Sequence, residues 1–373
     1  MFSTAASPST IIQQLEKVVE NPELYRSHRY EIISLANRVE VELQSPFALF
    51  QGIVHAAMPI VAVHVCQQHR ILHMMQENAE KGQPATSTAA LAEDTGINEH
   101  KLEAVLEFMA ARHLVDHISY KDMLSPPVFL SYFSQNTDKL ETCSHDHFTP
   151  SFTALNSFLS SPGQRSTAFQ LAHNTSGGIY DMQQAHPEMA RAFQNYLQLE
   201  HSYLPSWLNV VDFQARGGNG QQCVNLLTEY PNMKGRVILQ DTPSVVQDAL
   251  PHNRVERMGY DYFTEQPVKC AKAYHFRQIF HNNDDDACIR ILEALIPAMS
   301  SSSTLFINEN VLPDEEPSTE YRASLSLTMM ALFDTYERRE RDWHRLLGKV
   351  GLTVKEIRRF SRHGDSILMA VKG

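Results

Sequence analysis

The feature that most constrains the fold is a change of pattern after Pro205, where short β-type runs begin to alternate with helical segments. The β-type runs read GRVILQD, VERMGYDYF, CAKAYHFRQIFH and TLFINENVLP, and TVKEIRRFS and SILMAVKG close the chain as a pair of strands. Strands that are joined through helices pair in parallel, so this alternation predicts an α/β domain with a doubly wound, mainly parallel sheet. Ligands of such sheets bind at the carboxyl ends of the strands.

The part of the chain before this domain has apolar residues at helical spacing. A long apolar helix begins at Pro46, and Pro59 should bend it or end one segment, because the proline ring clashes with the preceding turn. This helix is more apolar than a small helical domain needs, which predicts a homodimer built through the N-terminal helices. The chain is therefore divided into a helical dimerisation domain over 1–125, a helical connector with substrate-pocket helices over 126–200, and the α/β domain over 201–373.

A winged-helix pattern is expected near the end of the first domain. Helices over Ala89 to Asp94 and Glu99 to Arg112 are separated by a turn at Gly96 and followed by a β-like stretch from Leu114 to Tyr120. The second helix carries three glutamates against one lysine and one arginine, so its face would repel phosphate. We therefore prefer a packing or dimerisation module to a DNA-binding one.

Composition excludes several classes of function. The formal net charge is −11, from 32 lysines and arginines against 43 acidic residues, which argues against nucleic acid and against anionic membrane surfaces. The 5 cysteines include no CxxC pair, so neither a zinc knuckle nor a disulfide framework is expected. The N-terminus lacks a basic segment followed by an apolar one, and we expect a cytoplasmic protein.

A glycine-rich run, RGGNG from Arg216 to Gly220, precedes an amphipathic helix. Glycines at that place let the backbone approach a ligand at the helix N-terminus. Asp241 follows some twenty residues later, at the end of GRVILQD, where a carboxylate commonly binds a ribose diol. A simple turn with a helix-capping aspartate explains these two features equally well.

Three further carboxylates and one histidine follow strands or begin helices. Asp261 lies in a loop after a strand, where it could accept from an adenine amine. His281 lies at a strand-to-helix junction, Glu309 at the end of an apolar strand, and Glu337 at the expected start of a helix. One histidine with two carboxylates can form a general base, whereas a capping histidine and an ordinary helix-terminal charge are the structural alternatives.

The order of these motifs resembles the caffeate-type O-methyltransferases, especially their fungal secondary-metabolite members, some of which are pericyclases. The resemblance covers nearly the whole chain, and it rests on LPSWL, GGNGQQC, GRVILQDTPSVV, MGYDYFTEQPVK, AYHFRQIFH, INENVLPD and ERRERDWHRLLGKVGL. It implies S-adenosylmethionine bound on a Rossmann-like sheet, and an N-terminal winged-helix domain that dimerises.

The resemblance also implies a role for individual residues. The glycine-rich cofactor loop falls on Gly217, Gly218 and Gly220, and the carboxylate that binds the ribose falls on Asp241. The pair that binds the adenine falls on Asp261 and Tyr262, and a cation near the cofactor falls on Arg277. The catalytic base falls on His281, and the acids that flank it fall on Glu309 and Glu337. Phe193 and Leu197, four residues apart on one helix, fall on the substrate wall, although plain core packing explains them equally well.

Two departures from the family pattern affect the expected activity. The family usually has His-Asp-Trp at the base, and this chain has His281, Asn282 and Asn283. Only NVVDFQA separates Leu208 from Arg216, so the first and central strand of the sheet is expected to be missing or shortened. A gap in the gene model, real divergence, and a truncated strand over Val210–Asp212 are the alternatives.

These features favour an S-adenosylmethionine-dependent O-methyltransferase that acts on a small hydroxylated secondary metabolite, with His281 as the general base. A methyltransferase-like enzyme that catalyses dehydration or pericyclic cyclisation is the alternative, and a silent partner that only dimerises is a third. No metal is expected, and the HDH run from His145 to His147 is interpreted as a solvated loop.

Overall fold

The structure is a computed structural model of the whole chain. It describes residues 7–83, 85–119, 123–125, 143–160, 166–193, 208, 220–247, 249–315, 318–361 and 364–373. The chain divides into two compact units, Met1–Ala62 and Val63–Gly373. The three-domain division expected from the sequence stays a prediction.

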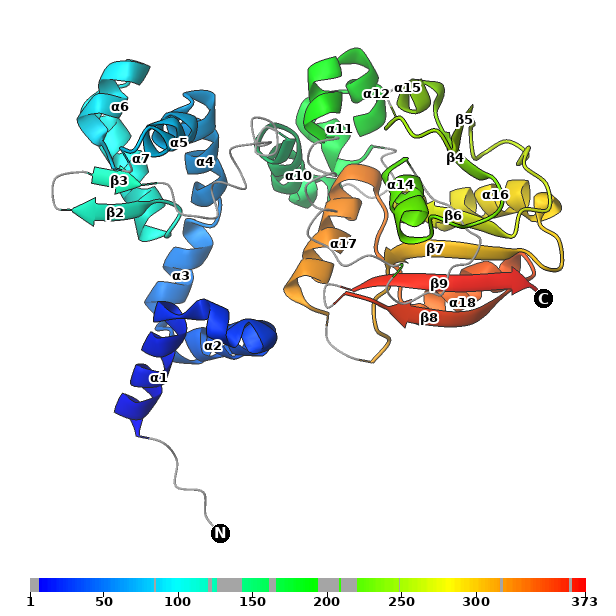
Figure 1. Cartoon of the computed structure of the whole chain (residues 1–373), viewed down its shortest axis with the longest axis horizontal. Coiled ribbons are helices and arrows are strands. Elements are labelled where there is room, and N and C mark those ends of the chain that lie inside the picture. The colour runs from blue at the N-terminus through cyan, green and yellow to red at the C-terminus, as the bar shows by residue number, and fades with distance from the viewer. Residues whose placement is uncertain are drawn as a thin grey trace, which may run out of the picture. The chain divides into compact units, whose positions relative to one another are not determined.

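The first unit consists of helices (Figure 1). Its elements are α1 (Pro8–Glu20), η1 (Pro22–His28), α2 (Arg29–Leu43) and α3 (Pro46–Val54). Ser7 and Ser45 cap α1 and α3, because each side chain accepts a hydrogen bond from a backbone N–H of the first turn. None of these four helices has a buried residue.

The predicted break at Pro59 is present. Helix α4 (Met58–Gln68) begins one residue before this proline, and it crosses from the first unit into the second. No single described helix is long and apolar enough to cross a membrane; α3 and α4 reach that length and apolarity only as a pair, bent by 41° at their break.

A small antiparallel sheet follows α5 (Ile71–Glu80). Strands β1 (Thr86–Ser87), β2 (Asp116–Ser119) and β3 (Met123–Ser125) lie in the order β1-β3-β2, with α6 (Thr88–Thr95) and α7 (Glu99–Ala111) between the first two. Gly96 ends α6 with a φ of 71°, a left-handed conformation that glycine adopts at little cost. The helices, the turn and the β segment predicted here are confirmed as elements; their winged-helix and dimerisation roles stay predictions.

Short helices fill the described part of the connector. They are the π-helical turn η2 (Cys143–Phe148), α10 (Thr149–Leu159), α11 (Ala168–His173), α12 (Ile179–Ala185) and a helical stretch over 187–193. Their apolar faces form one buried cluster with a side chain of α17 (Glu320–Phe333), and its members are Phe148, Phe169, Ile179, Met189, Ala192 and Leu332.

The described strands of the α/β domain form two sheets rather than one. In the first, β4 (Val237–Asp241) pairs in parallel with β5 (Val255–Gly259). In the second, the order is β6-β7-β9-β8. Here β6 (Ala273–Arg277) runs parallel to β7 (Thr304–Asn310), and β9 (Asp365–Lys372) is antiparallel to both β7 and β8 (Leu352–Arg359). The sheet is therefore mixed.

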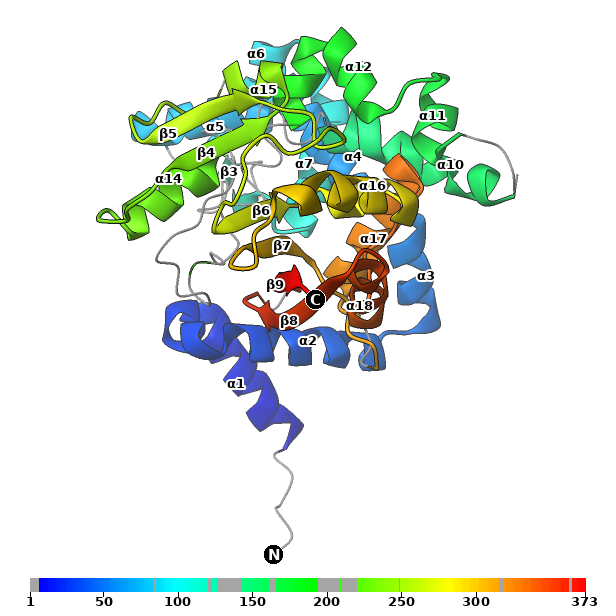
Figure 2. The ribbon, with the colours of Figure 1, turned by 90° about the vertical axis from the view of Figure 1, so that its right-hand side faces the viewer.

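A cavity of about 690 Å³ is lined by both β4 and β6. No strand among the described residues pairs with β4 or β6 on that side. The central strand of a doubly wound sheet would lie here, between β4 of one sheet and β6 of the other (Figure 2). Residues 209–219, to which the shortened strand was assigned, lie outside the described residues.

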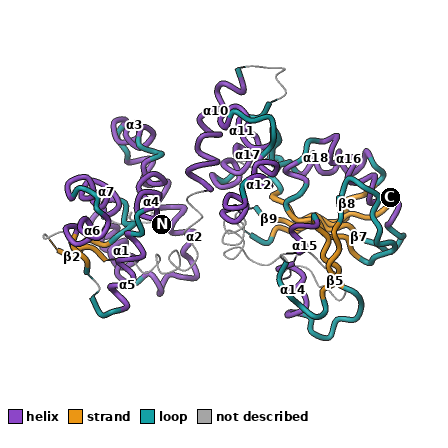
Figure 3. The backbone as a smooth tube through the Cα atoms, turned by 90° about the horizontal axis from the view of Figure 1, so that it is seen from above, coloured by secondary structure: helices purple, strands orange, loops and turns teal. Residues whose placement is uncertain are grey.

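Helices cover both faces of the strands (Figure 3). Helix α14 (Gly220–Glu229) packs on one face, against side chains of β4, β7 and β9. Helices α16 (Asp285–Leu295) and α18 (Glu340–Lys349) pack on the other. Along β7, the side chains of Leu305 and Ile307 pack with α16 and α18, and the side chain of Phe306 packs on the α14 face, because successive side chains of a strand point to opposite faces. Burial of each such side chain contributes about 1.5–3 kcal/mol, so both faces fix the position of β7.

Candidate active site

His281 lies in a tight turn at the carboxyl end of β6. The strand ends at Arg277, and Gln278 takes a left-handed conformation with a φ of 49° while its N–H donates to the Asn308 carbonyl of β7 at 3.0 Å. Residues other than glycine rarely adopt this conformation, and those that do are concentrated near functional sites. The 3-10 turn η4 (Phe280–Asn282) follows, and the buried Phe280 ring meets Trp343 edge to face at 5.9 Å. The strand-to-helix junction predicted for His281 is confirmed.

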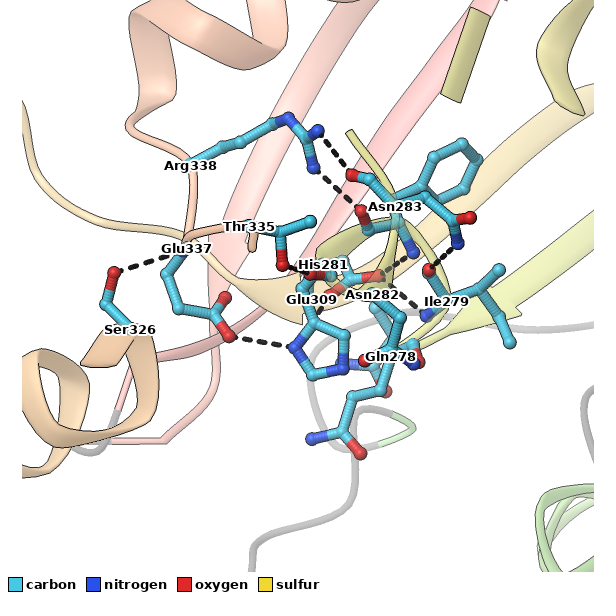
Figure 4. A network of polar contacts seen from close by, with 12 residues as sticks. Gln278, Ile279, His281, Asn282, Asn283, Glu309, Ser326, Thr335, Glu337 and Arg338 are labelled. Carbon is cyan, nitrogen blue, oxygen red and sulfur yellow. Dashed lines mark hydrogen bonds and ion pairs between the residues drawn. The ribbon is translucent and has the colours of Figure 1, made fainter. Parts of the chain in front are cut away.

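Two buried glutamates face the His281 imidazole (Figure 4). Nδ1 of His281 lies 2.8 Å from Oε1 of Glu337 and 3.7 Å from Oε2 of Glu309. The exposed fractions of His281, Glu309 and Glu337 are 7%, 1% and 2%. A hydrogen bond from Nδ1–H to Glu337 fixes the tautomer whose lone pair is on Nε2, which is the form of the ring that can accept a proton.

Glu309, the next-to-last residue of β7, holds the turn as well as facing the ring. Its Oε1 accepts hydrogen bonds from the backbone N–H groups of Ile279 and Phe280 at 3.0 and 2.9 Å. Burial raises the pKa of this carboxyl and the nearby charge of Glu337 adds to the rise, while the attraction to His281 opposes it. The predicted place of Glu309 at a strand's carboxyl end is confirmed.

The expected position of Glu337 at the start of a helix is wrong. Helix α18 begins at Glu340, and Glu337 lies in the segment between α17 and α18. Backbone hydrogen bonds from Leu312 to Arg338 and from Glu340 to Leu312 hold this segment against another loop, so it cannot form a helical turn. The N–H of Glu337 donates to the Ser326 hydroxyl at 3.2 Å. Outside the helix, the carboxylate can point at His281.

Thr335 and Arg338 also contact the turn, and the sequence did not single them out. The Thr335 hydroxyl donates to the His281 carbonyl at 2.5 Å, and Arg338 donates to the Phe280 and Asn283 carbonyls at 2.8 Å each. The only sequence signal for Arg338 is its place directly after Glu337, in a run with two further arginines.

The two asparagines that replace the family's Asp-Trp pair are both hydrogen-bonded. Asn282 donates to the Tyr180 hydroxyl of α12 at 3.0 Å and to the Gln278 carbonyl at 3.2 Å. Asn283 donates to the Ile279 carbonyl at 2.7 Å, and its side chain also hydrogen-bonds Tyr262. Both asparagine side chains therefore have hydrogen-bond partners, and they link the turn to Tyr180 and to Tyr262.

Phe193 belongs to an aromatic cluster that reaches this turn. Its ring meets the rings of Phe148 and Tyr180 edge to face, at 6.3 Å in both cases, and Tyr180 also lies 5.5 Å from Phe333. Through Tyr180 and Asn282 the cluster connects to the residue next to His281. Leu197, the other residue assigned to the substrate wall, lies outside the described residues.

Four of the residues assigned to the cofactor line the cavity between β4 and β6. They lie at the ends of β4 and β6 or just after β5, and they are Asp241, Asp261, Tyr262 and Arg277. Gly220 is the first residue of α14, whereas Gly217 and Gly218 lie outside the described residues. The cavity wall continues to Ile279, two residues before His281, so the cavity adjoins the turn.

The cavity fits a nucleoside cofactor. One oxygen of each carboxylate is used locally, since Oδ1 of Asp241 accepts from the Thr242 N–H at 2.7 Å and Oδ1 of Asp261 from the Phe263 N–H at 2.9 Å. The second oxygens are further acceptors, suited to ribose hydroxyls and an adenine amine. Burial raises the pKa values of Asp241 and of the Tyr262 phenol. The cavity of about 690 Å³ runs along the whole of β4 and β6 and so includes the place of a central strand, and the fit to a cofactor depends on the carboxylates at the strand ends.

Two groups of three among the described residues bring histidine and carboxylate side chains close enough to hold a metal ion. They are His281 with Glu309 and Glu337, and His64 with His145 and Asp146. In the first, Nδ1 is hydrogen-bonded to Glu337, which suits a base. In the second, the His64 and His145 rings stack at 4.0 Å and the His145 Nδ1 lies 2.7 Å from Asp146. The whole HDH run therefore lies in the half-buried π-helical turn η2, and its interpretation as a solvated loop is wrong.

A buried imidazole–carboxylate pair at the carboxyl ends of parallel strands, beside a cavity lined by two further carboxylates, is an arrangement that a cofactor-dependent α/β transferase can use. Residues 158–353, more than half of the chain, match the O-methyltransferase domain family, and the chain belongs to that family. S-adenosylmethionine is the family's cofactor, and the cavity residues suit it.

Proteins similar in sequence to this chain come from fungi. The O-methyltransferase ucdC of Aspergillus ustus is 29% identical over 286 residues, which are 72% of this chain and 75% of ucdC. The structure of LepI in complex with S-adenosylmethionine matches with a TM-score of 0.84 at 22% identity, over 98% of this chain and 100% of that one. A structure titled "A Pericyclic Reaction enzyme" also gives 0.84 at 22% identity, over 98% and 99%. These two structures share the fold, and the family resemblance found in the sequence is confirmed.

Proposed function

We propose that this protein is an S-adenosylmethionine-dependent O-methyltransferase that acts on a small hydroxylated secondary metabolite, with His281 as the general base. The observation that carries the proposal is the buried hydrogen bond of 2.8 Å between Nδ1 of His281 and Glu337. It makes Nε2 the proton-accepting atom, at a turn that adjoins the cofactor cavity.

In the proposed mechanism His281 removes the proton of the substrate hydroxyl through Nε2. Glu337 orients the ring and stabilises the imidazolium that forms, and Glu309 holds the backbone of the turn. When bound, S-adenosylmethionine supplies an electrophilic methyl group. Much of the rate enhancement then depends on holding the substrate oxygen in line with that methyl, because orientation converts a bimolecular step into an effectively unimolecular one.

The cofactor residues are proposed to act as follows. Asp241 binds the ribose, Asp261 and Tyr262 bind the adenine, and Arg277 supplies a nearby positive charge. The glycine loop with Gly217, Gly218 and Gly220 would pass close to the cofactor. The location of four of these residues on one cavity supports the assignment.

The substrate is proposed to pack against the aromatic cluster of Tyr180, Phe193 and Phe333, together with Leu197. Tyr180 is hydrogen-bonded to Asn282, so the cluster begins one residue from the base. Flat aromatic or polyketide-derived acceptors suit such a wall, because aromatic rings prefer offset or edge-to-face contact with one another.

The protein is proposed to be a cytoplasmic homodimer that associates through its N-terminal helices. Large apolar side chains of α1, α2 and α3 are exposed in the single chain, among them Leu15, Ile33, Leu49, Phe50 and Ile53. Exposed apolar surface of this extent favours a protein partner. Light scattering at micromolar concentration should give the mass of two chains, and a stable monomer would contradict the assignment.

A second candidate function is a methyltransferase-like enzyme that catalyses dehydration or pericyclic cyclisation. It is favoured by Asn282 and Asn283 in place of the family's Asp-Trp pair and by the cavity where a central strand would lie. In that case His281 would act as a hydrogen-bond donor or polarising group, and the product would carry no new methyl.

Incubation with methyl-labelled S-adenosylmethionine and a panel of phenols and enols separates the two functions. Label in the product is expected for the O-methyltransferase. If calorimetry shows that the cofactor binds and no label enters any product across the panel, methyl transfer is rejected. An unlabelled product that forms with S-adenosylmethionine and fails to form with S-adenosylhomocysteine, which lacks the sulfonium charge, would indicate the cyclase.

A further inference from the structure

We propose that Arg338 is the positioning residue of the active site, and that its side chain holds the His281 turn in the conformation in which the imidazole meets Glu337. The inference rests on the proposed function of His281 as a base. It concerns a residue that does not touch the reacting atoms and acts through the backbone of the turn.

The Arg338 guanidinium forms hydrogen bonds on both sides of His281 (Figure 4). Nη1 donates to the carbonyl of Phe280, the residue before the histidine, and Nη2 donates to the carbonyl of Asn283, two residues after it. Both distances are 2.8 Å. The two bonds therefore fix the backbone at both ends of η4 relative to the segment that carries Glu337.

The charge of this guanidinium is buried and balanced. Arg338 is only 2% exposed, and its Nε donates to Oδ1 of Asp285, the first residue of α16, at 3.0 Å. Its guanidinium also lies over the Trp343 ring, 5.6 Å from the ring centroid. A buried charge needs such partners, because removing it from water costs several kcal/mol. The side chain is thus held by α16 and α18 while it holds η4.

An arginine suits this position better than a lysine. The three contacts use Nε, Nη1 and Nη2, which diverge in one plane and reach two carbonyls and a carboxylate together. A lysine ammonium is a single centre and cannot bond all three at these positions. Two other donors lie near these carbonyls: the Asn283 N–H, 3.2 Å from the Phe280 oxygen, and the Cys288 thiol, a weak donor at 3.4 Å from each oxygen.

Without Arg338, two carbonyls at the ends of a three-residue turn lose their charged donor. The turn could then rotate, and the imidazole would leave the 2.8 Å contact that sets its tautomer. A displacement of 1 Å in a catalytic group can cost on the order of 100-fold in rate. The effect should therefore fall on turnover and not on cofactor affinity.

The test compares Arg338→Met, Arg338→Lys and the control Arg345→Met in the full-length protein. Arg345 also pairs with Asp285, at 3.7 Å, but its side chain is 54% exposed. Arg338→Met is expected to lower kcat for methyl transfer by roughly 10- to 100-fold, with the cofactor Kd unchanged. Arg338→Lys should recover part of the loss, and Arg345→Met should behave as wild type.

A second readout does not depend on methyl transfer. In ¹⁵N-histidine spectra, with the signal assigned by its loss in His281→Gln, wild type and Arg345→Met should show one Nδ1-protonated ring. Arg338→Met should broaden or shift that signal. An unchanged signal and an unchanged kcat in folded Arg338→Met would overturn the proposal. A wild type that transfers no methyl would reject the proposed function, and the spectra would still decide the positioning role.

If Arg338→Met does not fold, Asp285→Asn replaces it. This variant keeps an acceptor for Nε but removes the balancing charge, so the same changes are expected at smaller amplitude. An Asp285→Asn protein with the wild-type His281 signal and wild-type kcat would overturn the proposal.

Discussion

The two ends of the candidate site differ in how their polar groups are bonded. At the His281 turn, the ring, the flanking backbone and both glutamates are buried and bonded to one another or to Thr335 and Arg338. At the cavity, Asp241 and Asp261 each bond one neighbouring backbone N–H and have a second oxygen for a ligand. The groups proposed for proton transfer are therefore positioned by the protein alone, whereas the groups proposed for the cofactor keep acceptors that a ligand could use.

The largest expected effect is the loss of turnover in Glu337→Gln, which disrupts the pre-formed contacts of the His281 turn. The amide can present its NH₂ group to Nδ1 of His281, which would place the ring proton on Nε2 and remove the acceptor. Turnover should fall by about 100- to 10,000-fold, while calorimetry gives an unchanged cofactor affinity. Glu340→Gln, at the start of α18 with a side chain that is 42% exposed, is the control and should keep wild-type turnover.

At the cavity the corresponding change is Asp241→Ala or Asp261→Ala. Each removes an acceptor for a ligand hydroxyl or amine, and the expected loss of binding free energy is about 1–3 kcal/mol per site. Calorimetric titration with S-adenosylmethionine measures it, with the exposed Asp286→Ala as the control. Unchanged affinity in both variants would mean that the cofactor binds elsewhere.

A smaller effect is expected on the pH dependence of stability. Burial raises the pKa of Glu309 above its ordinary value of 4.5. Between 4.5 and the raised value the unfolded chain has released this proton and the folded protein still holds it. The contribution of Glu309 to the free energy of unfolding should therefore fall as pH rises through that window.

Glu309→Gln cannot titrate, so this part of the decline should disappear. Thermal unfolding of wild type and Glu309→Gln at several pH values from about 4.5 upward measures the difference. Glu340→Gln should keep the wild-type slope. Identical slopes for wild type and Glu309→Gln would show that the carboxyl has the same proton affinity in the folded and unfolded chain.

Much of the α/β domain could be predicted because its signals are local. Each strand was expected from a short β-type run, and Glu309 and Asp261 were placed correctly because their positions at or after strand ends are visible in the sequence. Glu337 was misplaced because a charged run such as ERRERD resembles a helix start. Only the contact with Leu312 shows that the helix begins later.

The partners of the turn could not be predicted, for a physical reason. Arg338 is 55 residues from Asn283, and Tyr180 is 102 residues from Asn282. No periodicity relates such pairs, since tertiary packing alone brings them together. The expectation of a missing or shortened central strand depends on residues 209–219, which lie outside the described residues, and it stays a prediction.

The central claim is that His281 is the base of a methyl-transfer reaction. The most direct measurement is the rate of label transfer from methyl-labelled S-adenosylmethionine to a hydroxylated acceptor, for wild type and His281→Ala at saturating cofactor. We expect labelled product from wild type, at a rate that rises with pH as the imidazole loses its proton. We expect a rate lower by roughly 100- to 10,000-fold from the variant, with its cofactor affinity intact. Labelled product from His281→Ala at the wild-type rate would contradict the claim.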